Sequence, residues 1–337
     1  MAAVFTQTNE ADGNRVIAFR RGPDGQLAGL ETHETGGAGD GVPHLTSQGS
    51  VVLTADGTRL LVTNAGSNDI SVYAVGSNGL ELLQTVSSGG AAPKSVAEHA
   101  GLVYVVNTGD GSLVGFRMSE EGLKALPDGR VELPDGADPA QVGFTPDGSR
   151  LVVTHRGGNS IALYPVDVEG RLGTPTVQAS SGPTPYGFAF ASNGTLVVTE
   201  AFGAQKGKAA ASSYRINGGS ATPVSRSVGN GRSEICWAVV TNDDRYAFTT
   251  NFADGAVSRF AIAPDGSITL EDAAAGVSVE GRPGLRDQAL SGDGAFLYAI
   301  DADAGRVFGW GVGSEGELLP MGSWEGVPKT VAGLAAS

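Results

Sequence analysis

Residues 50–64 read Ser50-Val-Val-Leu-Thr-Ala-Asp56-Gly57-Thr-Arg-Leu-Leu-Val-Thr-Asn64, which is two apolar segments joined by an Asp-Gly turn. Residues 141–155 repeat the phrase as Gln141-Val-Gly-Phe-Thr-Pro-Asp147-Gly148-Ser-Arg-Leu-Val-Val-Thr-His155. An Asp-Gly turn between two alternating apolar segments is a strong signal for a β-hairpin. The phrase therefore predicts a pair of antiparallel strands that occurs more than once in the chain.

Copies of the second strand recur about every 45 residues. They end in Leu-Val-Tyr-Val-Val-Asn107, Leu-Val-Val-Thr-Glu200, Tyr-Ala-Phe-Thr-Thr-Asn251 and Phe-Leu-Tyr-Ala-Ile-Asp301, and Val4-Phe-Thr-Gln-Thr-Asn9 adds a seventh copy. A period of this length with short alternating strands is typical of a β-propeller, because a helical repeat would show a period of about 3.6 residues. We therefore expect an all-β fold, a seven-bladed β-propeller.

The first copy lacks a first strand, because Val4 lies almost at the N-terminus. The missing strand is expected at the other end of the chain, where Pro328-Lys329-Thr-Val-Ala resembles Pro93-Lys94-Ser-Val-Ala. The C-terminal strand would then complete the N-terminal blade, which removes the free sheet edges of an open ring. No Pro/Ser-rich linker divides the chain, so we expect residues 1–337 to form a single domain.

The composition favours some partners and argues against others. A formal charge of −14 and a pI near 4.7 argue against a nucleic-acid or anionic-membrane partner, which would require a basic face. No apolar run approaches the length that spans a bilayer. Cys236 is the one cysteine, so an intramolecular disulfide is excluded, and the first residues do not resemble a signal peptide. We expect a cytoplasmic monomer.

A polar residue ends the second strand in every copy. Asn or Asp occupies five of the seven positions, and such a side chain can bond the backbone of the following turn, so a structural role accounts for these five. His155 and Glu200 depart from the pattern in neighbouring blades and together offer an acid/base pair. We treat both as candidate catalytic residues, and a structural role remains the alternative for each. The seven positions are Asn9, Asn64, Asn107, His155, Glu200, Asn251 and Asp301.

Cations gather on the same predicted face, because in a propeller the first strands begin on the face where the second strands end. Lys94, Arg286 and Lys329 lie at or beside the starts of first strands, and Arg156 directly follows His155. A recessed cluster of cations raises the local concentration of anions, so a small anionic substrate is predicted. The alternative is that these cations form ion pairs with Asp287, Glu234 or Asp301. The candidate substrate-binding residues are Lys94, Arg286, Lys329, Tyr186, Trp237, Gln141, His44, Asn251 and Asp301, and Arg156 is a further catalytic candidate.

Other kinds of site have weaker support. The chain has no His-x-His, His-Glu-x-x-His or paired Cys motif, so zinc ligands of the right spacing are lacking. Oxygen ligands such as Glu200, Asn251 and Asp301 could hold a hard cation, which is a minor alternative. Cys236 could be a nucleophile only if a neighbour lowered its pKa, and a lone buried cysteine is more often inert. We expect neither a metal nor a cofactor.

The repeat resembles the seven-bladed propeller lactonase family, which includes 6-phosphogluconolactonase and carboxymuconate cyclase. The segment Val152-Val-Thr-His155-Arg156-Gly157-Gly158-Asn159-Ser160-Ile161 is similar to the family's Val-Ser-Asn-Arg-Gly-His-Asp-Ser-Ile, so Arg156 falls on the family arginine. This chain has His155 in place of the family asparagine and Gly158 in place of the family histidine. Glu200 looks like the glutamate of the family's Val-Asn-Glu segment.

The resemblance implies hydrolysis of a small anionic lactone. Glu200 or His155 would activate a water as general base, and Arg156 and its neighbouring cations would stabilise the oxyanion and bind the substrate's acidic group. Tyr186 and Trp237 would form an apolar wall. Two alternatives remain open: a cyclase or isomerase that closes a lactone from an unsaturated acid, and a propeller that binds a ligand or protein without catalysis.

Overall fold

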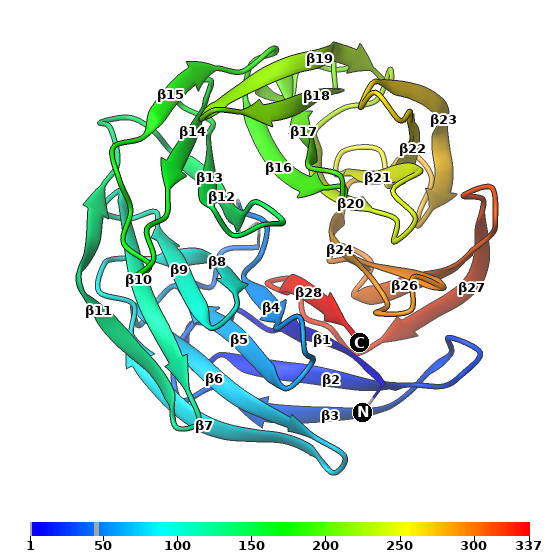
Figure 1. Cartoon of the computed structure of the whole chain (residues 1–337). Helices are drawn as coiled ribbons and strands as arrows, with labels where there is room; N and C mark the ends of the chain where they lie inside the picture. Colours follow the sequence, from blue (N-terminus) through cyan, green and yellow to red (C-terminus); the bar gives the residue numbers. More distant parts are fainter. Residues whose placement is uncertain (1, 44–46) are drawn as a thin grey trace.

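The computed structural model describes residues 2–43 and 47–337, and in them seven four-stranded sheets surround a central channel (Figure 1). Neighbouring strands in every sheet are antiparallel. This architecture confirms the predicted seven-bladed β-propeller. We number the blades 1 to 7 in chain order and give the strands of each blade from the channel outwards.

The strands of the first four blades follow the order expected from the repeat. Blade 1 contains β28 (Ala332–Ala336), β1 (Ala3–Gln7), β2 (Arg15–Arg21) and β3 (Leu27–Glu34). Blade 2 contains β4 (Val51–Leu53), β5 (Arg59–Asn64), β6 (Asp69–Gly76) and β7 (Gly79–Ser87). Blade 3 contains β8 (Pro93–His99), β9 (Leu102–Asn107), β10 (Ser112–Ser119) and β11 (Gly122–Glu132). Blade 4 contains β12 (Pro139–Phe144), β13 (Arg150–His155), β14 (Ser160–Pro165) and β15 (Thr176–Ala179).

The last three blades repeat the pattern. Blade 5 contains β16 (Pro185–Phe190), β17 (Thr195–Glu200), β18 (Ala210–Asn217) and β19 (Ser220–Gly229), with the short 3₁₀ helix η1 (Phe202–Ala204) between β17 and β18. Blade 6 contains β20 (Ile235–Val240), β21 (Tyr246–Asn251), β22 (Ala256–Ile262) and β23 (Ile268–Val277). Blade 7 contains β24 (Leu285–Leu290), β25 (Phe296–Asp301), β26 (Arg306–Val312) and β27 (Leu318–Glu325).

The C-terminal strand closes the ring. β28 pairs antiparallel with β1, with Val4 opposite Ala336 and Thr6 opposite Leu334, so the two termini lie close together (Figure 1). The expectation that the last strand completes the first blade is confirmed. β1 is therefore paired on both sides, with β28 and with β2, and does not form an edge of its sheet.

The register of blade 1 corrects two predicted equivalences. In blade 4, His155 pairs with Pro139 on one side and with Ser160 on the other. The residue of blade 1 that pairs in this way is Gln7, opposite Ala332 and Val16. The residue at the end of the second strand is therefore Gln7 and not Asn9.

The same shift applies at the C-terminus. Because Ala332 occupies the position of Pro93, the equivalent of Lys94 is Gly333, and the predicted equivalence of Lys329 with Lys94 is wrong. Lys329 instead lies exposed in the loop between β27 and β28. The similarity of Pro328-Lys329 to Pro93-Lys94 misplaced the strand by four residues.

The inner strands carry an extra residue near their starts. In blade 4, Pro139 pairs with His155 and Gln141 with Thr154, so Ala140 has no partner on β13. A register shift of this kind occurs in blade 1 and in blades 3 to 7. Such a β-bulge redirects the side chain of the extra residue and bends the strand.

Apolar side chains fill the spaces between neighbouring blades. Tyr104 of blade 3 shares a cluster with Leu151 of blade 4, and Ile300 of blade 7 shares one with Val4 of blade 1. Burial of apolar area contributes about 25 cal/mol per Å², so each blade is stabilised by both of its neighbours. The core is thus distributed around the ring instead of lying in one central layer.

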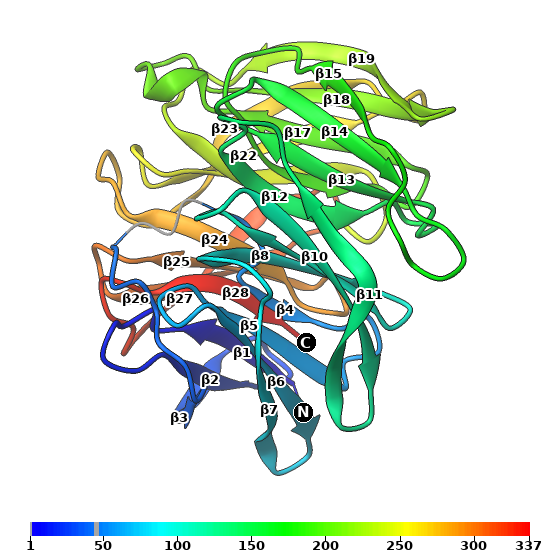
Figure 2. The ribbon, with the colours of Figure 1, turned by 90° about the vertical axis from the view of Figure 1, so that its left-hand side faces the viewer.

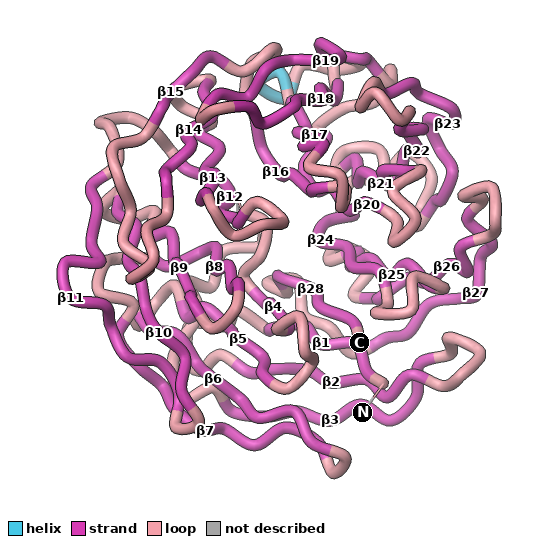
Figure 3. The backbone as a smooth tube through the Cα atoms, viewed as in Figure 1, coloured by secondary structure: helices cyan, strands magenta, loops and turns pink. Residues whose placement is uncertain are grey.

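The ring has two unlike faces. The mouth face carries the starts of the inner strands and the ends of the second strands, and the far face carries the Asp-Gly turns and the hairpins between the outer strands. Figure 2 shows both termini and the β10–β11 hairpin on one side, which is the far face. Figure 3 shows how little of the fold is helical. None of the helical segments in the described part of the chain is long and apolar enough to span a membrane.

Ring closure predicts unequal roles for two leucines. Leu334 of β28 is 7% exposed and packs with Val4, whereas Leu319 of β27 is 60% exposed. We expect Leu334→Ala to lower the free energy of unfolding by about 2–4 kcal/mol, because it leaves a cavity at the closing strand. Leu319→Ala, the matched control, should change it by less than about 0.5 kcal/mol. Urea denaturation measures both, and equal effects would contradict the closure argument.

Candidate functional site

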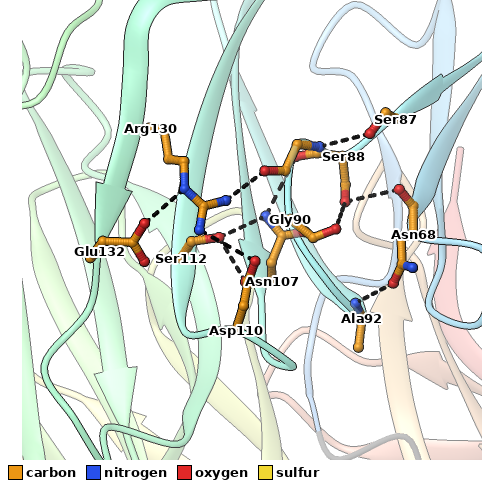
Figure 4. A network of polar contacts seen from close by, with 11 residues as sticks. Asn68, Ser87, Ser88, Gly90, Ala92, Asn107, Asp110, Ser112, Arg130 and Glu132 are labelled. Carbon is orange, nitrogen blue, oxygen red and sulfur yellow. Dashed lines mark hydrogen bonds and ion pairs between the residues drawn. The ribbon is translucent and has the colours of Figure 1, made fainter.

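Side chains at the ends of the second strands hold the loops that lead from one blade to the next. Asn107 Nδ2 donates to the carbonyl of Ser88, in the loop between blades 2 and 3, at 3.4 Å, and to Ser112 Oγ at 3.3 Å (Figure 4). Asn68, in the preceding turn, accepts the N–H of Ala92 in the same loop at 2.7 Å. These bonds satisfy backbone groups that the loop would otherwise bury unpaired. A structural role in holding these loops therefore explains the contacts of the strand-end asparagine side chains.

Asn251 and Asp301 are placed in the same way. Asn251 donates to Ser258 Oγ at 2.9 Å and accepts from Asn230 at 2.8 Å. Asp301 accepts from Ser278 Oγ at 2.6 Å and from the N–H of Ala304 at 2.9 Å. Both side chains are buried inside their own blades. Their contacts favour a structural role over the predicted contact with substrate.

Glu200 also has partners for both of its carboxylate oxygens. Oε1 accepts from Ser212 Oγ at 2.6 Å and from the N–H of Gly182 at 2.8 Å, and Oε2 accepts from Ser227 Oγ at 2.7 Å. Burial raises the pKa of Glu200, and the three hydrogen bonds oppose that effect. Glu200 is fully buried within blade 5, so its contacts join the loop from blade 4 to strands β18 and β19.

His155 occupies the same position in blade 4. Its Nδ1 lies 3.2 Å from Ser160 Oγ, and its Nε2 is buried with no hydrogen-bond partner among the described residues. Burial lowers the pKa of His155 to about 4, so the ring is neutral at pH 7. In the described part of the chain no hydrogen bond or shared partner links His155 to Glu200, so the structure does not bring the two together as an acid/base pair.

The bulge residues of blades 5 to 7 meet on the mouth face. Tyr186, Cys236 and Arg286 each follow the first residue of an inner strand. The ring of Tyr186 lies edge-on to Trp237, with centroids 5.8 Å apart, and the guanidinium of Arg156 lies 5.2 Å from the Tyr186 centroid. We call Arg156, Tyr186, Cys236, Trp237 and Arg286 the mouth cluster. It joins four of the residues predicted to form the site.

Arg286 is the most unusual member of the mouth cluster. Its side chain lies over the ring of Phe252, 5.5 Å from the centroid, and the residue is only 3% exposed. Its Nε and Nη1 have no hydrogen-bond partner among the described residues, and no carboxylate there lies within ion-pair distance. Burial lowers the pKa of Arg286, but guanidinium remains charged in proteins. The nearby charges of Asp287, Asp303 and Asp301 oppose that shift without forming an ion pair in the described chain. Burying a cation that forms no ion pair among these residues costs free energy, which a bound anion would offset.

Two further groups of the mouth cluster have defined protonation states. Burial raises the pKa of Tyr186 well above its usual value, and its hydroxyl has no partner among the described residues. Burial also raises the pKa of the Cys236 thiol, and the nearby charge of Glu234 raises it further. Both groups are therefore protonated at pH 7, and Cys236 does not have the low pKa that a nucleophile requires.

Two of the predicted cations on the mouth face form ion pairs. Lys94 forms an ion pair with Asp40 at 3.0 Å, and Arg156 forms one with Asp138 at 2.5 Å. The alternative that some cations form ion pairs is thus observed, although the partners differ from those expected. Lys329 is exposed. His44 lies outside the described residues.

Ser47 and Gln48, in the loop between blades 1 and 2, reach across the channel to blades 4 and 6. Gln48 donates through Nε2 to the carbonyl of Ala238 at 2.8 Å and accepts the N–H of Ala238 at 3.0 Å. The carbonyl of Ser47 accepts the indole N–H of Trp237 at 3.0 Å, and Ser47 Oγ donates to the carbonyl of Ala140 at 2.5 Å. This segment joins blade 2 to blades 4 and 6 and fixes Trp237 in place.

The channel continues on the far side of Gln48. A pocket of 400 Å³ extends from Gln48, Gln141 and Asp287 to Leu53 and Ala336 at the far-face ends of the inner strands. Gln141 is predicted to bind substrate, but its amide bonds both backbone groups of Phe188, at 3.1 and 2.6 Å. Burial raises the pKa of Asp287 to about 7.

Phe252 and Gln48 of this region were not predicted from the sequence, and Glu234 was named only as an alternative ion-pair partner of the cations. Phe252 follows β21 and Glu234 precedes β20, at positions that Arg156 and Asp138 occupy in blade 4. The residue types at these positions differ from blade to blade, so the repeat does not mark them. Gln48 lies in a long loop whose course across the channel the sequence does not indicate. No group of three or more His, Cys, Asp or Glu side chains suited to a metal ion occurs among residues 2–43 and 47–337.

Comparisons with known proteins agree with the fold. Residues 7–124, 122–206 and 199–330 match the family model described as lactonase, seven-bladed β-propeller. A comparison with curated protein sequences finds no significant match.

Solved structures give further similarity to whole chains. A Bacteroides fragilis protein provisionally assigned as a 6-phosphogluconolactonase has a TM-score of 0.74 at 18% identity and covers 100% of this chain and 98% of its own. A Lactobacillus plantarum protein has the same TM-score and identity, with 100% of both chains covered. A Desulfotomaculum acetoxidans protein of unknown function reaches 0.74 at 13% identity, with 98% of each covered. At these identities the structures support the fold alone.

The buried His155 predicts a specific dependence of stability on pH. Its pKa is about 4 in the folded protein and 6.5 for a solvent-exposed histidine, so the unfolded chain binds the proton more strongly. The stability that His155 contributes is present above pH 6.5 and is lost as the pH falls through 4, by about 3 kcal/mol in total. Blades 2, 3 and 6 have asparagine at this position, and His155→Asn should abolish the loss of stability at low pH because asparagine does not titrate. Urea unfolding between these pH values measures it, with His33→Asn as control, and an unchanged pH profile would contradict the burial argument.

Proposed function

Because the chain belongs to the seven-bladed β-propeller lactonase family, we propose that it hydrolyses a small lactone bearing a carboxylate or phosphate group. The observation that supports an anionic substrate is the buried guanidinium of Arg286, whose Nε and Nη1 have no partner in the described part of the chain. A lactone alone would not require such a cation. An acidic group on the substrate would pair with it in a site of low dielectric constant.

The mouth cluster supplies the groups that ester hydrolysis needs around the carbonyl. Tyr186 is protonated and its hydroxyl has no partner among the described residues, so it can donate a hydrogen bond to the oxyanion as the carbonyl becomes tetrahedral. Arg156 lies against the Tyr186 ring and adds positive charge nearby. Trp237, held by Ser47, forms the apolar wall predicted from the sequence.

Glu234 is the carboxylate best placed to act as general base. It immediately precedes β20, it is half-buried, and its charge acts on the Cys236 thiol together with the charges of Arg156 and Arg286. Burial and Asp254 raise the pKa of Glu234, which makes its ionised form a stronger base. Glu200, in contrast, has three donors on its carboxylate. We therefore assign the base to Glu234 and keep His155, which is neutral and whose Nε2 has no partner among the described residues, as the second candidate.

The proposed reaction proceeds in two steps. Glu234 takes a proton from a water molecule as the water oxygen bonds to the lactone carbonyl carbon, and Tyr186 stabilises the resulting oxyanion. The ring C–O bond then breaks, and the protonated Glu234 returns its proton to the departing alkoxide oxygen. The product is an open-chain hydroxy acid, and the groups involved are the same for lactone closure in the reverse direction.

Binding of an organic anion without catalysis is the second candidate. It is favoured by the same unpaired Nε and Nη1 of Arg286 in the described part of the chain and by the low exposure of Tyr186, which is 3%. The two functions differ only in whether the bound lactone is opened. Turnover therefore separates them.

The test is hydrolysis of a panel of five- and six-membered lactones with and without a carboxylate or phosphate, followed by acid release. We expect Tyr186→Phe to lower kcat by about 10²-fold and Glu234→Gln by about 10²- to 10⁴-fold, through loss of the oxyanion donor and the base. Arg286→Gln should raise KM mainly for the anionic lactones. The rate should also rise with pH through the raised pKa of Glu234, because only the carboxylate accepts a proton.

Two variants serve as controls for these results. Glu280→Gln changes an exposed carboxylate and should leave turnover unchanged. Glu200→Gln should lower the urea midpoint, since the amide nitrogen cannot accept the donors that surround it, while the pH profile of any remaining activity stays as in wild type. The assignment of the base fails if Glu234→Gln matches wild type, and the catalytic proposal fails if no lactone is opened.

A further inference from the structure

A second pocket lies on the far face, between blades 4 and 5. Its volume is 510 Å³, larger than the channel pocket at 400 Å³. The Asp-Gly turn of blade 4 and the β18–β19 hairpin of blade 5 form its walls. Phe190 and Ile216 supply apolar surface, and Arg150 and Arg215 supply positive charge.

Arg150 has no acceptor for its guanidinium among the described residues. Its side chain lies flat against the turn at Gly219, with Nη1 3.5 Å and Cζ 3.7 Å from the point where a Cβ would lie. No carboxylate in the described chain lies within ion-pair distance, and the residue is half-buried at the pocket wall. Arg150 is thus held in position by packing while its N–H groups remain available.

Arg215 adds a second positive charge that forms no ion pair within the described chain. Hydrogen bonds from Ser267 and, more weakly, the charge of Arg215 lower the pKa of Asp265, so Asp265 offsets part of this charge. Its Nη1 donates to the carbonyl of Asn193 at 3.1 Å, and its Nη2 donates to the carbonyl of Pro264 at 2.9 Å. These hydrogen bonds to neutral carbonyl oxygens hold the Arg215 side chain in place but do not neutralise its positive charge. Asp147 is the one acid in the described pocket lining, and Thr145 Oγ1 and the backbone and hydroxyl of Ser149 already donate to it.

The equivalent positions in two other blades are different. The N–H of Thr145 donates to the carbonyl of Arg150, and the N–H of Thr241 donates to the carbonyl of Tyr246, which identifies Tyr246 as the counterpart in blade 6. Tyr246 covers the turn at Gly316 in blade 7, as Arg150 covers Gly219. Phe296 of blade 7 covers Gly25 of blade 1 in the same way. Blade 4 therefore has a cation where blades 6 and 7 have an aromatic ring.

The arginines beside those aromatic rings are neutralised. Arg245 pairs with Glu315 at 2.8 Å across the seam between blades 6 and 7. Arg21 pairs with Asp293 at 3.4 Å across the seam between blades 7 and 1. The hairpin of blade 5 that faces Arg150 instead reads Asn217-Gly218-Gly219-Ser220 and offers no acid. The seam between blades 4 and 5 thus combines an open pocket with positive charge in a chain of net charge −14.

We propose that the pocket between blades 4 and 5 binds a small organic oxyanion, with Arg150 as its main cation. The planar guanidinium suits the paired oxygens of a carboxylate or phosphate, and Phe190 and Ile216 provide a surface for the apolar part of the ligand. The site lies on the face opposite the mouth cluster. It does not depend on the lactone chemistry proposed above.

The test is isothermal titration calorimetry of the full chain with phenyl phosphate, benzoate and inorganic phosphate at an ionic strength of about 20 mM, where charge pairs are screened least. We expect phenyl phosphate or benzoate to bind with a Kd of about 1 mM. Inorganic phosphate should bind more weakly because it lacks an apolar part. Arg150→Gln should weaken binding by about 10-fold through loss of the charge-assisted pair.

Arg245→Gln is the matched control, because it removes a far-face arginine that already has an acidic partner. It should leave the Kd within about twofold of wild type. The proposal is overturned if none of the three anions binds, if Arg150→Gln binds as wild type does, or if Arg245→Gln weakens binding equally. Turnover of lactones by Arg150→Gln should equal that of wild type, so failure of the mouth site and failure of this pocket give different results.

Discussion

The antiparallel pairing of β28 with β1 is the contact on which the rest of the ring depends. Each blade packs its apolar faces against two neighbours, and blade 7 has a second neighbour only because the C-terminal strand completes blade 1. Without that pairing, the cluster that joins Ile300 to Val4 would face solvent. Closure also fixes the diameter of the channel, and with it the distances between inner strands that lie on opposite sides.

The mouth cluster is a consequence of this geometry combined with the bulges. A regular inner strand would alternate its side chains between the channel and the strand's other face, whereas the extra residue near each start is redirected. In blades 5 to 7 these residues are Tyr186, Cys236 and Arg286, so an aromatic ring, a thiol and a guanidinium meet on one side of the mouth. Asp287, next to Arg286, instead lines the channel pocket together with Gln48.

The sequence predicted the blades better than it predicted the site. Asp-Gly turns and alternating apolar residues are local signals, so the seven blades followed from them directly. The closing strand was predicted at the correct end of the chain but four residues too early. The strand ends were harder, since His155 and Glu200 differ in type from the asparagines of other blades but occupy the same structural position. His155 and Glu200 differ from the asparagines because their side chains contact different partners, although they lie at the same place at the end of the second strand. Partners such as Ser227 for Glu200, or Glu234 beside Cys236, come from other parts of the chain and leave no periodic trace.

The distribution of charge distinguishes the two proposed anion sites. At long range a net charge of −14 repels anions, so affinity must come from contacts shorter than the screening length. Arg286 is 3% exposed, so its interaction with a bound anion is screened little by salt, and its cost in the empty protein is high. Arg150 is half-buried in an open pocket, so its pairing is weaker and more sensitive to ionic strength. The proposed mouth site would therefore bind its substrate selectively, and the proposed far-face pocket would hold an anion loosely, with an occupancy that follows the anion concentration.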